Sequence, residues 1–339
     1  MRADMHEVTS SFEDILDRVS RSRITLVAGI SDTGKSTLVR RLADELPAMV
    51  VDSDIGQSDM GPPSVVSLGY RREGRFHMTD GYFVGSVTPA RHFLQLMAGV
   101  SRMVLQCNRY PLIVNTTGLA TGGIGRTLLT EKINAVSPDL IITISTDNEL
   151  SYLNAFRKCG IEIMNMMPGP DVREKSRAER NLLRGRAFRE HFEGASVQSI
   201  ALQDTGIERS LLNNGAVVSP DTIRSELGFD AVHVEVSGDE AIAVFEDLVP
   251  ERETIALAFG TKVISAYAAS DFENVLVGII DRDGHLSGLG IVKSIDFDRK
   301  VINILTCAKD FSVIQFGTMK LDPETFASAG QFLPSFYRA

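Results

Sequence analysis

The sequence predicts an α/β fold in which a parallel sheet has helices on both faces, followed by a smaller, mostly-β domain. In the first half, apolar runs without polar alternation occur at 24–28, 48–51, 111–118 and 139–145, and stretches with helical spacing separate them. Strands of this kind are buried on both faces, which is typical of a parallel sheet between helices. After about residue 200, short runs rich in Val and Ile are joined by turns such as DRDGH, which indicates an antiparallel barrel or sandwich.

The length of the chain supports this division into domains. A chain of 339 residues can bury two separate cores. We expect a lead-in helix within 1–22, because the stretch SFEDILDRV spaces its apolar residues as a helix does. We expect the α/β domain to occupy 23–198 and the mostly-β domain to occupy 199–339.

The composition argues against several classes of protein. The net charge is −9 and the acidic excess lies after residue 200, which argues against a protein that coats nucleic acid without specificity. The polar N-terminus and the lack of long apolar runs predict neither a secretory signal nor a membrane span. Cys107, Cys159 and Cys307 lie far apart with no CxxC pair. We therefore expect buried free thiols and a cytoplasmic protein.

The stretch GISDTGKST, residues 29–37, satisfies the GxxxxGK[ST] pattern of a phosphate-binding loop and stands between an apolar strand and a helix. Its glycines allow a turn whose N–H groups face phosphate oxygens at the positive end of a helix. Lys35 can reach the β and γ phosphates, and the Ser36 hydroxyl can bind Mg²⁺. The motif therefore predicts the fold of a P-loop NTPase that binds ATP or GTP with Mg²⁺. The predicted nucleotide contacts are Gly29, Asp32, Thr33, Gly34, Lys35, Ser36 and Thr37.

A pair of carboxylates follows the next apolar run, in the stretch VDSDIGQ. Asp52 and Asp54 are two residues apart, so their side chains point to the same side if the strand continues. Beside a bound triphosphate, one carboxylate can hold Mg²⁺ or its waters, and the other can accept the proton of an attacking hydroxyl. A solvated turn with two aspartates is the alternative interpretation.

Five stretches in order resemble one family. GISDTGKST, DSDIGQ, GYFVGSVTP, VNTTGLATGGIG and an arginine-rich helix ending in FREHFEG are similar to elements of the polynucleotide 5′-hydroxyl kinases. These are the kinases of the pre-mRNA cleavage complex and of ribosomal-RNA processing, and the chain resembles their short prokaryotic form from about Ile24 to Gly194. The resemblance implies transfer of the γ-phosphate of ATP or GTP to the 5′-hydroxyl of RNA or DNA, in processing or repair.

The resemblance also implies roles for individual residues. Lys35 and Ser36 would bind the triphosphate and the metal, and Asp52 would be the general base for the 5′-hydroxyl. Asp54 would help to hold the metal, and Gln57 would support the metal and its waters near the substrate.

A second group of implied roles concerns the acceptor strand. Thr117 and Gly118 match part of the family's clasp, which holds the phosphates or the acceptor end. The family usually has Trp after this pair, whereas here the residue is Leu119 and the chain has no Trp. The stacking that an aromatic ring gives a base, about 1–3 kcal/mol, is then missing or comes from residues such as Tyr82 and Phe83.

The arginine-rich stretch at about 171–192 is predicted to be a lid. Its arginines at 173, 177, 180 and 184 are spaced to share one helical face. Guanidinium groups can stabilise the oxygens of a transferring phosphoryl group. The resemblance indicates Arg180 and Arg184 as the catalytic arginines. A salt-bridged surface helix is the alternative.

Two other functions remain open from the sequence. The chain can be a P-loop kinase of a small hydroxylated metabolite, which the modest basic character and the missing Trp favour. It can also be a nucleotide-dependent assembly factor that transfers no phosphate, although the intact set of Lys35, Ser36 and Asp52 argues against this. For the kinase, the expected partners are RNA or DNA 5′-hydroxyl ends, and the sequence identifies no protein partner.

Overall fold

The computed structural model describes residues 10–170, 172–210, 212–228, 230–247, 249–251, 255–256 and 260–333. The chain divides into two compact units, residues 1–184 and 185–339. Residues 1–9 of the predicted lead-in segment, Asp171 at the start of the predicted lid and residues 334–339 lie outside the described residues. The domain boundary expected at 198/199 stays a prediction.

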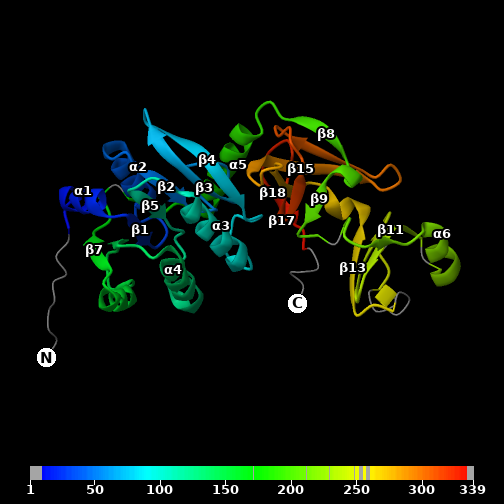
Figure 1. The fold of residues 1–339 in the computed structure, drawn as a ribbon, viewed down its shortest axis with the longest axis horizontal. Helices are drawn as coiled ribbons and strands as arrows, with labels where there is room; N and C mark the ends of the chain where they lie inside the picture. Colours follow the sequence, from blue (N-terminus) through cyan, green and yellow to red (C-terminus); the bar gives the residue numbers. More distant parts are fainter. Residues whose placement is uncertain are drawn as a thin grey trace. The chain divides into compact units, whose positions relative to one another are not determined.

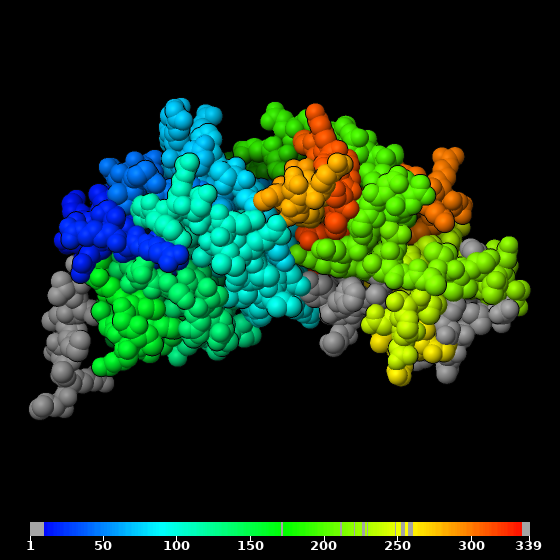
Figure 2. All heavy atoms as spheres, in the orientation of Figure 1, coloured from blue at the N-terminus to red at the C-terminus, as the bar shows by residue number. Residues whose placement is uncertain are grey.

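The first unit is built on one sheet with the strand order β4-β3-β2-β5-β1-β6-β7 (Figure 1). The strands β2, β5, β1, β6 and β7 pair in parallel, as the apolar runs predict. An antiparallel hairpin, β3 and β4, extends one edge, and its tip projects from the surface (Figure 2). The strands are β1 (Ile24–Gly29), β2 (Met49–Asp52), β3 (Val65–Arg72), β4 (Arg75–Phe83), β5 (Leu112–Asn115), β6 (Leu140–Ile144) and β7 (Glu162–Met166).

Helices cover both faces of this sheet, which confirms the predicted architecture. On one face, apolar side chains of two helices pack with Val27 and Ile142 of the sheet. On the other face, two further helices pack with Val51 and Val114. The first pair is α1 (Phe12–Arg21) and α2 (Lys35–Glu45), the second pair is α3 (Phe93–Gln106) and α4 (Gly122–Val136), and η1 (Ser151–Cys159) and α5 (Arg177–His191) follow.

The parallel pairing brings the carboxyl ends of β1, β2 and β5 to one edge of the sheet. The three motifs singled out in the sequence follow these three ends: the phosphate-binding loop after β1, the DSDIGQ stretch after β2 and the NTTG stretch at the end of β5. In open α/β sheets, ligands bind beyond the carboxyl ends of the strands. The fold therefore places the motifs where such a site forms.

The second unit is mostly β, as predicted. One sheet has the order β18-β17-β14-β15-β16-β8 with β9 beside β17, and the other has the order β10-β11-β12-β13. The strands are β8 (Ser196–Ala201), β9 (Gly206–Glu208), β10 (Ala216–Val217), β11 (Ala231–Ser237), β12 (Glu240–Phe245), β13 (Val263–Ala268), β14 (Val275–Ile280), β15 (Leu286–Asp296), β16 (Val301–Thr306), β17 (Val313–Leu321) and β18 (Ser328–Gln331). The short helical turns are η2 (Leu202–Asp204), α6 (Pro220–Thr222), η3 (Ile223–Leu227) and η4 (Ala269–Phe272).

The cysteines differ from the expectation of buried thiols. All three are free, but Cys107 alone among them is buried. Cys159 is the last residue of η1 and Cys307 follows the end of β16, and both are exposed. Among the described residues, no helix combines the length and the apolar character that a membrane span requires.

Candidate active site

The phosphate-binding loop closes tightly between β1 and α2. Gly34 caps α2 with a φ of 95°, which favours glycine. A Cβ on Gly29 would lie 2.5 Å from Thr33 Oγ1, so no side chain fits there. Lys35 is buried, and its Nζ donates a hydrogen bond across the loop to Ile30 O at 2.7 Å. The loop is therefore formed around the lysine that the sequence predicts to contact phosphate.

The surroundings of Lys35 lower the pKa of its amine. Burial lowers the pKa of Lys35 to about 8, and the carboxylates of Asp54 and Asp32 oppose this shift. Ser36 lies in the first turn of α2 and is half-buried, whereas Thr37 is exposed. The loop thus presents a buried cation at the N-terminal end of a helix, where anions bind favourably.

Asp52 is the last residue of β2, and its carboxylate is buried and fully oriented. Its Oδ1 accepts hydrogen bonds from Asn115 Nδ2 at 3.0 Å and from the backbone N of Asp54 at 3.1 Å. Its Oδ2 accepts from Ser58 Oγ at 3.0 Å and from the backbone N of Asp59 at 2.9 Å. Burial, together with the negative charges of Asp54 and Asp59, raises the pKa of Asp52 to about 7. This carboxyl group therefore exchanges a proton near neutral pH.

One of these donors can release its hydrogen bond. Ser58 Oγ lies 3.0 Å from Asp52 Oδ2 and 2.6 Å from Met60 O. A hydroxyl has a single proton, so Ser58 donates to one of the two oxygens at a time. When it donates to Met60, a lone pair on Asp52 Oδ2 becomes available to another hydroxyl.

Asp54 has a different environment. Its Oδ1 accepts hydrogen bonds from the backbone N of Gly56 and of Gln57, both at 3.1 Å, which closes the turn after β2. The residue is half-buried. Since its carboxylate opposes the pKa shift of Lys35, it lies within electrostatic reach of the phosphate-binding loop.

Sequence reasoning missed Asn115. It ends β5 directly opposite Asp52 in the parallel ladder, and it was included in an otherwise apolar run. Its Oδ1 is buried and has no hydrogen-bond partner in the described part of the chain. A polar residue at the carboxyl end of a buried strand, next to the strand that carries the carboxylates, is the signal that identifies it.

The clasp residues lie against the phosphate-binding loop. A Cβ on Gly118 would lie 2.6 Å from the backbone N and Cα of Ser31, so the two backbones are in direct contact. Thr117 Oγ1 accepts a hydrogen bond from Leu119 N at 3.0 Å. Leu119 is 37% exposed. The structure therefore places Gly118 directly against the phosphate-binding loop.

The lid differs from the predicted helix. Helix α5 begins at Arg177, so Arg173 lies before it and does not share a helical face with Arg177, Arg180 and Arg184. The reason is a capping interaction: Glu179 N donates to Ser176 Oγ at 3.1 Å, and Ser176 N donates to Glu179 Oε2 at 2.7 Å. Arg173 instead pairs with Glu179 at 2.7 Å.

The lid is joined to the phosphate-binding loop through Asp32. Arg180 Nη2 lies 2.5 Å from Asp32 Oδ2, and the backbone N of Lys175 donates to the same oxygen at 3.1 Å. Burial raises the pKa of Asp32, but these bonds outweigh it and leave the pKa below its usual value. Lys175 Nζ also reaches Gln57 Oε1 at 3.4 Å. Two residues with separately predicted roles, Asp32 and Arg180, are thus paired with each other.

Arg184 lies on the same helix and is half-buried. Its Nη2 donates to Asn181 Oδ1. Burial and the charges of Arg180 and Arg177 lower its pKa, and Asp54 opposes them. The guanidinium group is therefore within electrostatic reach of Asp54. Asp54 and Asp52 together form the carboxylate element of the site.

The oxygen groups in this region suit Mg²⁺. The Ser36 hydroxyl and the Asp54 carboxylate are hard oxygen donors. Within the described residues, no group of three or more His, Cys, Asp or Glu side chains gathers as a metal site.

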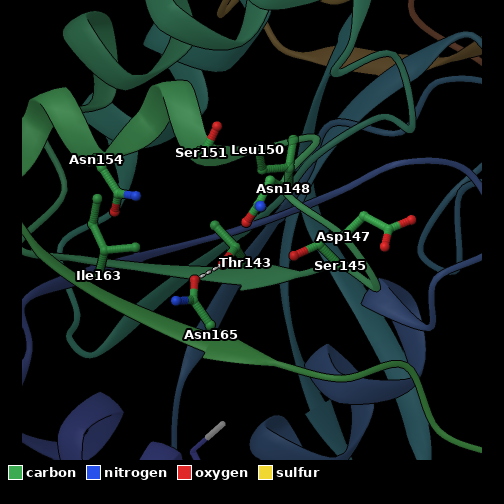
Figure 3. A pocket seen from close by; sticks show the side chains of 9 residues that line it. All are labelled: Thr143, Ser145, Asp147, Asn148, Leu150, Ser151, Asn154, Ile163 and Asn165. Carbon is green, nitrogen blue, oxygen red and sulfur yellow. Dashed lines mark hydrogen bonds between the residues drawn. The ribbon is translucent and has the colours of Figure 1, made fainter. Parts of the chain in front are cut away.

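A separate small hollow lies at the carboxyl ends of β6 and β7 (Figure 3). Its lining is largely polar, and Thr143 and Asn165 point toward one another in it and share a hydrogen bond. In the sheet order, β6 and β7 lie on the other side of β1 from β2. The carboxylate element is therefore not part of this hollow.

Comparison with known proteins identifies the family. The family model of the mRNA cleavage and polyadenylation factor CLP1 P-loop matches residues 29–194. A polyribonucleotide 5′-hydroxyl-kinase of Pyrococcus abyssi is 30% identical over 317 residues, which cover 87% of this chain and 87% of the relative. The chain belongs to the same family as this relative. A polyribonucleotide 5′-hydroxyl-kinase of Methanocaldococcus jannaschii is also 30% identical, over 91% of this chain and 89% of the relative.

Solved structures of the family share the fold. A wild-type Clp1p–Pcf11p complex aligns with a TM-score of 0.61 at 11% identity, covering 91% of this chain and 78% of that chain. At this identity the likeness concerns the fold alone. Membership of the family confirms the predicted resemblance and implies that the chain binds a nucleotide at its P-loop.

Proposed function

We propose that the chain is a polynucleotide 5′-hydroxyl kinase that transfers the γ-phosphate of ATP or GTP to the 5′-hydroxyl of RNA. The observation that carries the proposal is the buried, oriented carboxylate of Asp52 at the sheet edge that also holds the phosphate-binding loop. The names of the archaeal relatives support RNA as the acceptor. A cytoplasmic location is part of the proposal, and the free cysteines support it.

In this proposal the donor nucleotide occupies the loop from Gly29 to Thr37, with Lys35 on the β and γ phosphates. Ser36 and Asp54 would hold Mg²⁺, which neutralises phosphate charge when bound. Arg180 and Arg184 would stabilise the charge that develops on the transferring group. Their positions beside Asp32 and within reach of Asp54 support that role.

The acceptor chemistry is assigned to Asp52. The oxygen of the 5′-hydroxyl attacks the γ-phosphorus, the bond from this phosphorus to the β–γ bridging oxygen breaks, and the nucleoside diphosphate leaves. The hydroxyl proton passes to Asp52 Oδ2 once Ser58 has turned its own proton to Met60 O. Gln57, Thr117 and Gly118 would position the acceptor end, with Leu119 beside it in place of an aromatic ring.

The test is incubation with γ-labelled ATP, Mg²⁺ and matched RNA and DNA strands that carry either a 5′-hydroxyl or a 5′-phosphate. Label on 5′-hydroxyl RNA and not on 5′-phosphate RNA is the expected result. Label on DNA at an equal rate would extend the acceptor class. If no strand is labelled although ATP binds, the proposal is wrong, and a metabolite kinase or an assembly factor takes its place.

A further inference from the structure

The buried face of helix α4 contains one lysine, Lys132, among apolar residues and a glycine. The inward face of this helix consists of Gly125, Leu128, Leu129, Lys132, Ile133 and Val136. The Lys132 side chain is only 1% exposed. An amine removed from water in this way is costly unless partners compensate it. We therefore expect the buried ammonium group of Lys132 to hold polar partners in place.

The contacts of Lys132 lead to the carboxylate element. Its Nζ donates a hydrogen bond to Ser53 Oγ at 2.7 Å. Ser53 Oγ in turn donates to Asn115 O at 2.7 Å, and Asn115 Nδ2 donates to Asp52 Oδ1 at 3.0 Å. Asn115 accepts from Ser53 with its backbone carbonyl and donates to Asp52 with its side-chain amide, so the contacts of Lys132 reach Asp52 through the position of this residue.

The electrostatic surroundings indicate the same association. Burial lowers the pKa of Lys132 to about 8, and the carboxylates of Asp54 and Asp52 oppose this shift. Lys35 on the phosphate-binding loop contributes repulsion. Two buried lysines from different elements therefore act on one common carboxylate, that of Asp54. Lys132 alone of the two also acts on Asp52, and it extends from α4 to Ser53.

We propose that Lys132 is a positioning residue for the phosphoryl transfer, which fixes the direction of the Asp52 carboxylate through Ser53 and Asn115. The inference rests on the proposed kinase function. Lys132 itself touches neither substrate, since its ammonium group ends on Ser53. Without its hydrogen bond, the segment 52–54 and the end of β5 remain bonded to each other but lose their tie to α4, and the direction of Asp52 Oδ2 toward the acceptor hydroxyl is held less firmly.

The experiment compares the full chain with Lys132→Met, Ser53→Ala and the double variant. Methionine keeps most of the volume of the lysine but removes its charge and its donors. The matched control is Ile133→Val, a mild change at the neighbouring position of the same buried face. For each protein we would measure kcat, the KM for ATP and for 5′-hydroxyl RNA, binding of a fluorescent ATP analogue, and Tm.

We expect Lys132→Met and Ser53→Ala each to lower kcat by about 10- to 100-fold, with both KM values and nucleotide binding within about threefold of the parent. The double variant should be no slower than the slower single variant, because both changes break one series of contacts. Ile133→Val should keep the parent kcat whatever its Tm.

Three results would overturn the inference: a kcat of Lys132→Met close to that of Ile133→Val, additive losses in the double variant, or a loss confined to nucleotide affinity. If Lys132→Met does not fold, Ser53→Ala decides in the same way, with an unchanged kcat against the inference. An inactive parent protein that binds ATP would instead reject the kinase function itself, so the two failures are distinguishable.

Discussion

Two buried carboxylates, Asp52 in the first unit and Glu235 in the second, are surrounded by similar numbers of donors but differ in chemistry. Glu235 on β11 accepts hydrogen bonds from three consecutive backbone N–H groups, those of Asn213, Asn214 and Gly215, and pairs with His233 Nε2 at 2.6 Å. Asp52 has a comparable set of donors, but two further carboxylates lie near it. The pKa values of the two carboxyl groups shift in opposite directions.

For Glu235, burial raises the pKa, but the bonds from His233 and the backbone outweigh it and hold the pKa below its usual value. For Asp52, burial and the neighbouring negative charges raise the pKa to about 7. The number of donors alone therefore does not decide the role of a buried carboxylate. The balance between burial and hydrogen bonding does. At Asp52, burial and the charges of Asp54 and Asp59 outweigh the hydrogen bonds, so the group can exchange a proton, whereas at Glu235 the hydrogen bonds outweigh burial and hold an anion that organises a turn.

The largest expected effect is on catalysis. Asp52→Asn should lower phosphoryl transfer on the order of a hundredfold or more, because the amide cannot accept the hydroxyl proton. ATP affinity should remain, since the phosphate-binding loop is unchanged. Single-turnover rates and nucleotide binding would measure both. Glu235→Gln serves as the control with an unchanged rate, and an unchanged rate in Asp52→Asn would remove Asp52 as the base.

The pH dependence of folding should separate the two carboxylates. Because the folded-state pKa of Asp52 is about 7 against 3.8 for the free group, the folded state binds more protons and loses stability as pH rises from 4 to 7. Asp52→Asn loses one acceptor for a backbone N–H at every pH, but its free energy of unfolding should rise relative to that of the parent by about 3 kcal/mol between pH 4 and pH 7. Urea titrations without nucleotide and with chelator measure this, and parallel pH curves would contradict it.

Glu235 should behave in the opposite sense. Its lowered folded-state pKa contributes stability above the usual value of 4.5, and this contribution is lost as pH falls through the folded-state value. Glu235→Gln should cost about 1–2 kcal/mol at pH 7, because one of its terminal atoms can no longer accept from the backbone. The difference from the parent should shrink in acid. An equal difference at pH 7 and pH 3.5 would contradict the assigned charge.

The smallest expected effect concerns Ser58, which has no counterpart at Glu235. Ser58→Ala removes the hydroxyl that shares its proton between Asp52 and Met60. We expect a decrease in kcat of about threefold to tenfold, in line with the loss of one hydrogen bond to a charged group, with KM values nearly unchanged. Steady-state kinetics measure this. A tenfold or greater rise in the KM for RNA would instead place Ser58 in acceptor binding.

The sequence predicts the central architecture of the first unit well, because its strands are apolar throughout and its phosphate-binding loop has a fixed pattern. The strands of the β3–β4 hairpin are harder to recognise in the sequence, since residues 75–80 form no continuous apolar run and alternate between exposed and partly buried positions. The start of α5 was wrong because arginine spacing was given more weight than the capping pair Ser176 and Glu179.

Within the candidate site, local motifs identified Lys35, Asp52 and Gly118, but not the residues that support them. Asn115 and Lys132 contact the carboxylate element from strands and helices that are distant in the chain. No local pattern encodes such a contact. In the sequence, only a polar residue within an otherwise apolar face indicates such a contact.

The contact between Gly118 and Ser31 has a consequence for how substrate preference can change. Gly118 lies against both the backbone and the Oγ of Ser31, with no room for a Cβ, so this contact fixes the distance between the phosphate-binding loop and residues 117–118. A substitution at 118 would change this distance. Leu119 is partly exposed next to that contact, and we expect substitutions there to change the preferred acceptor while the geometry of the transfer stays the same.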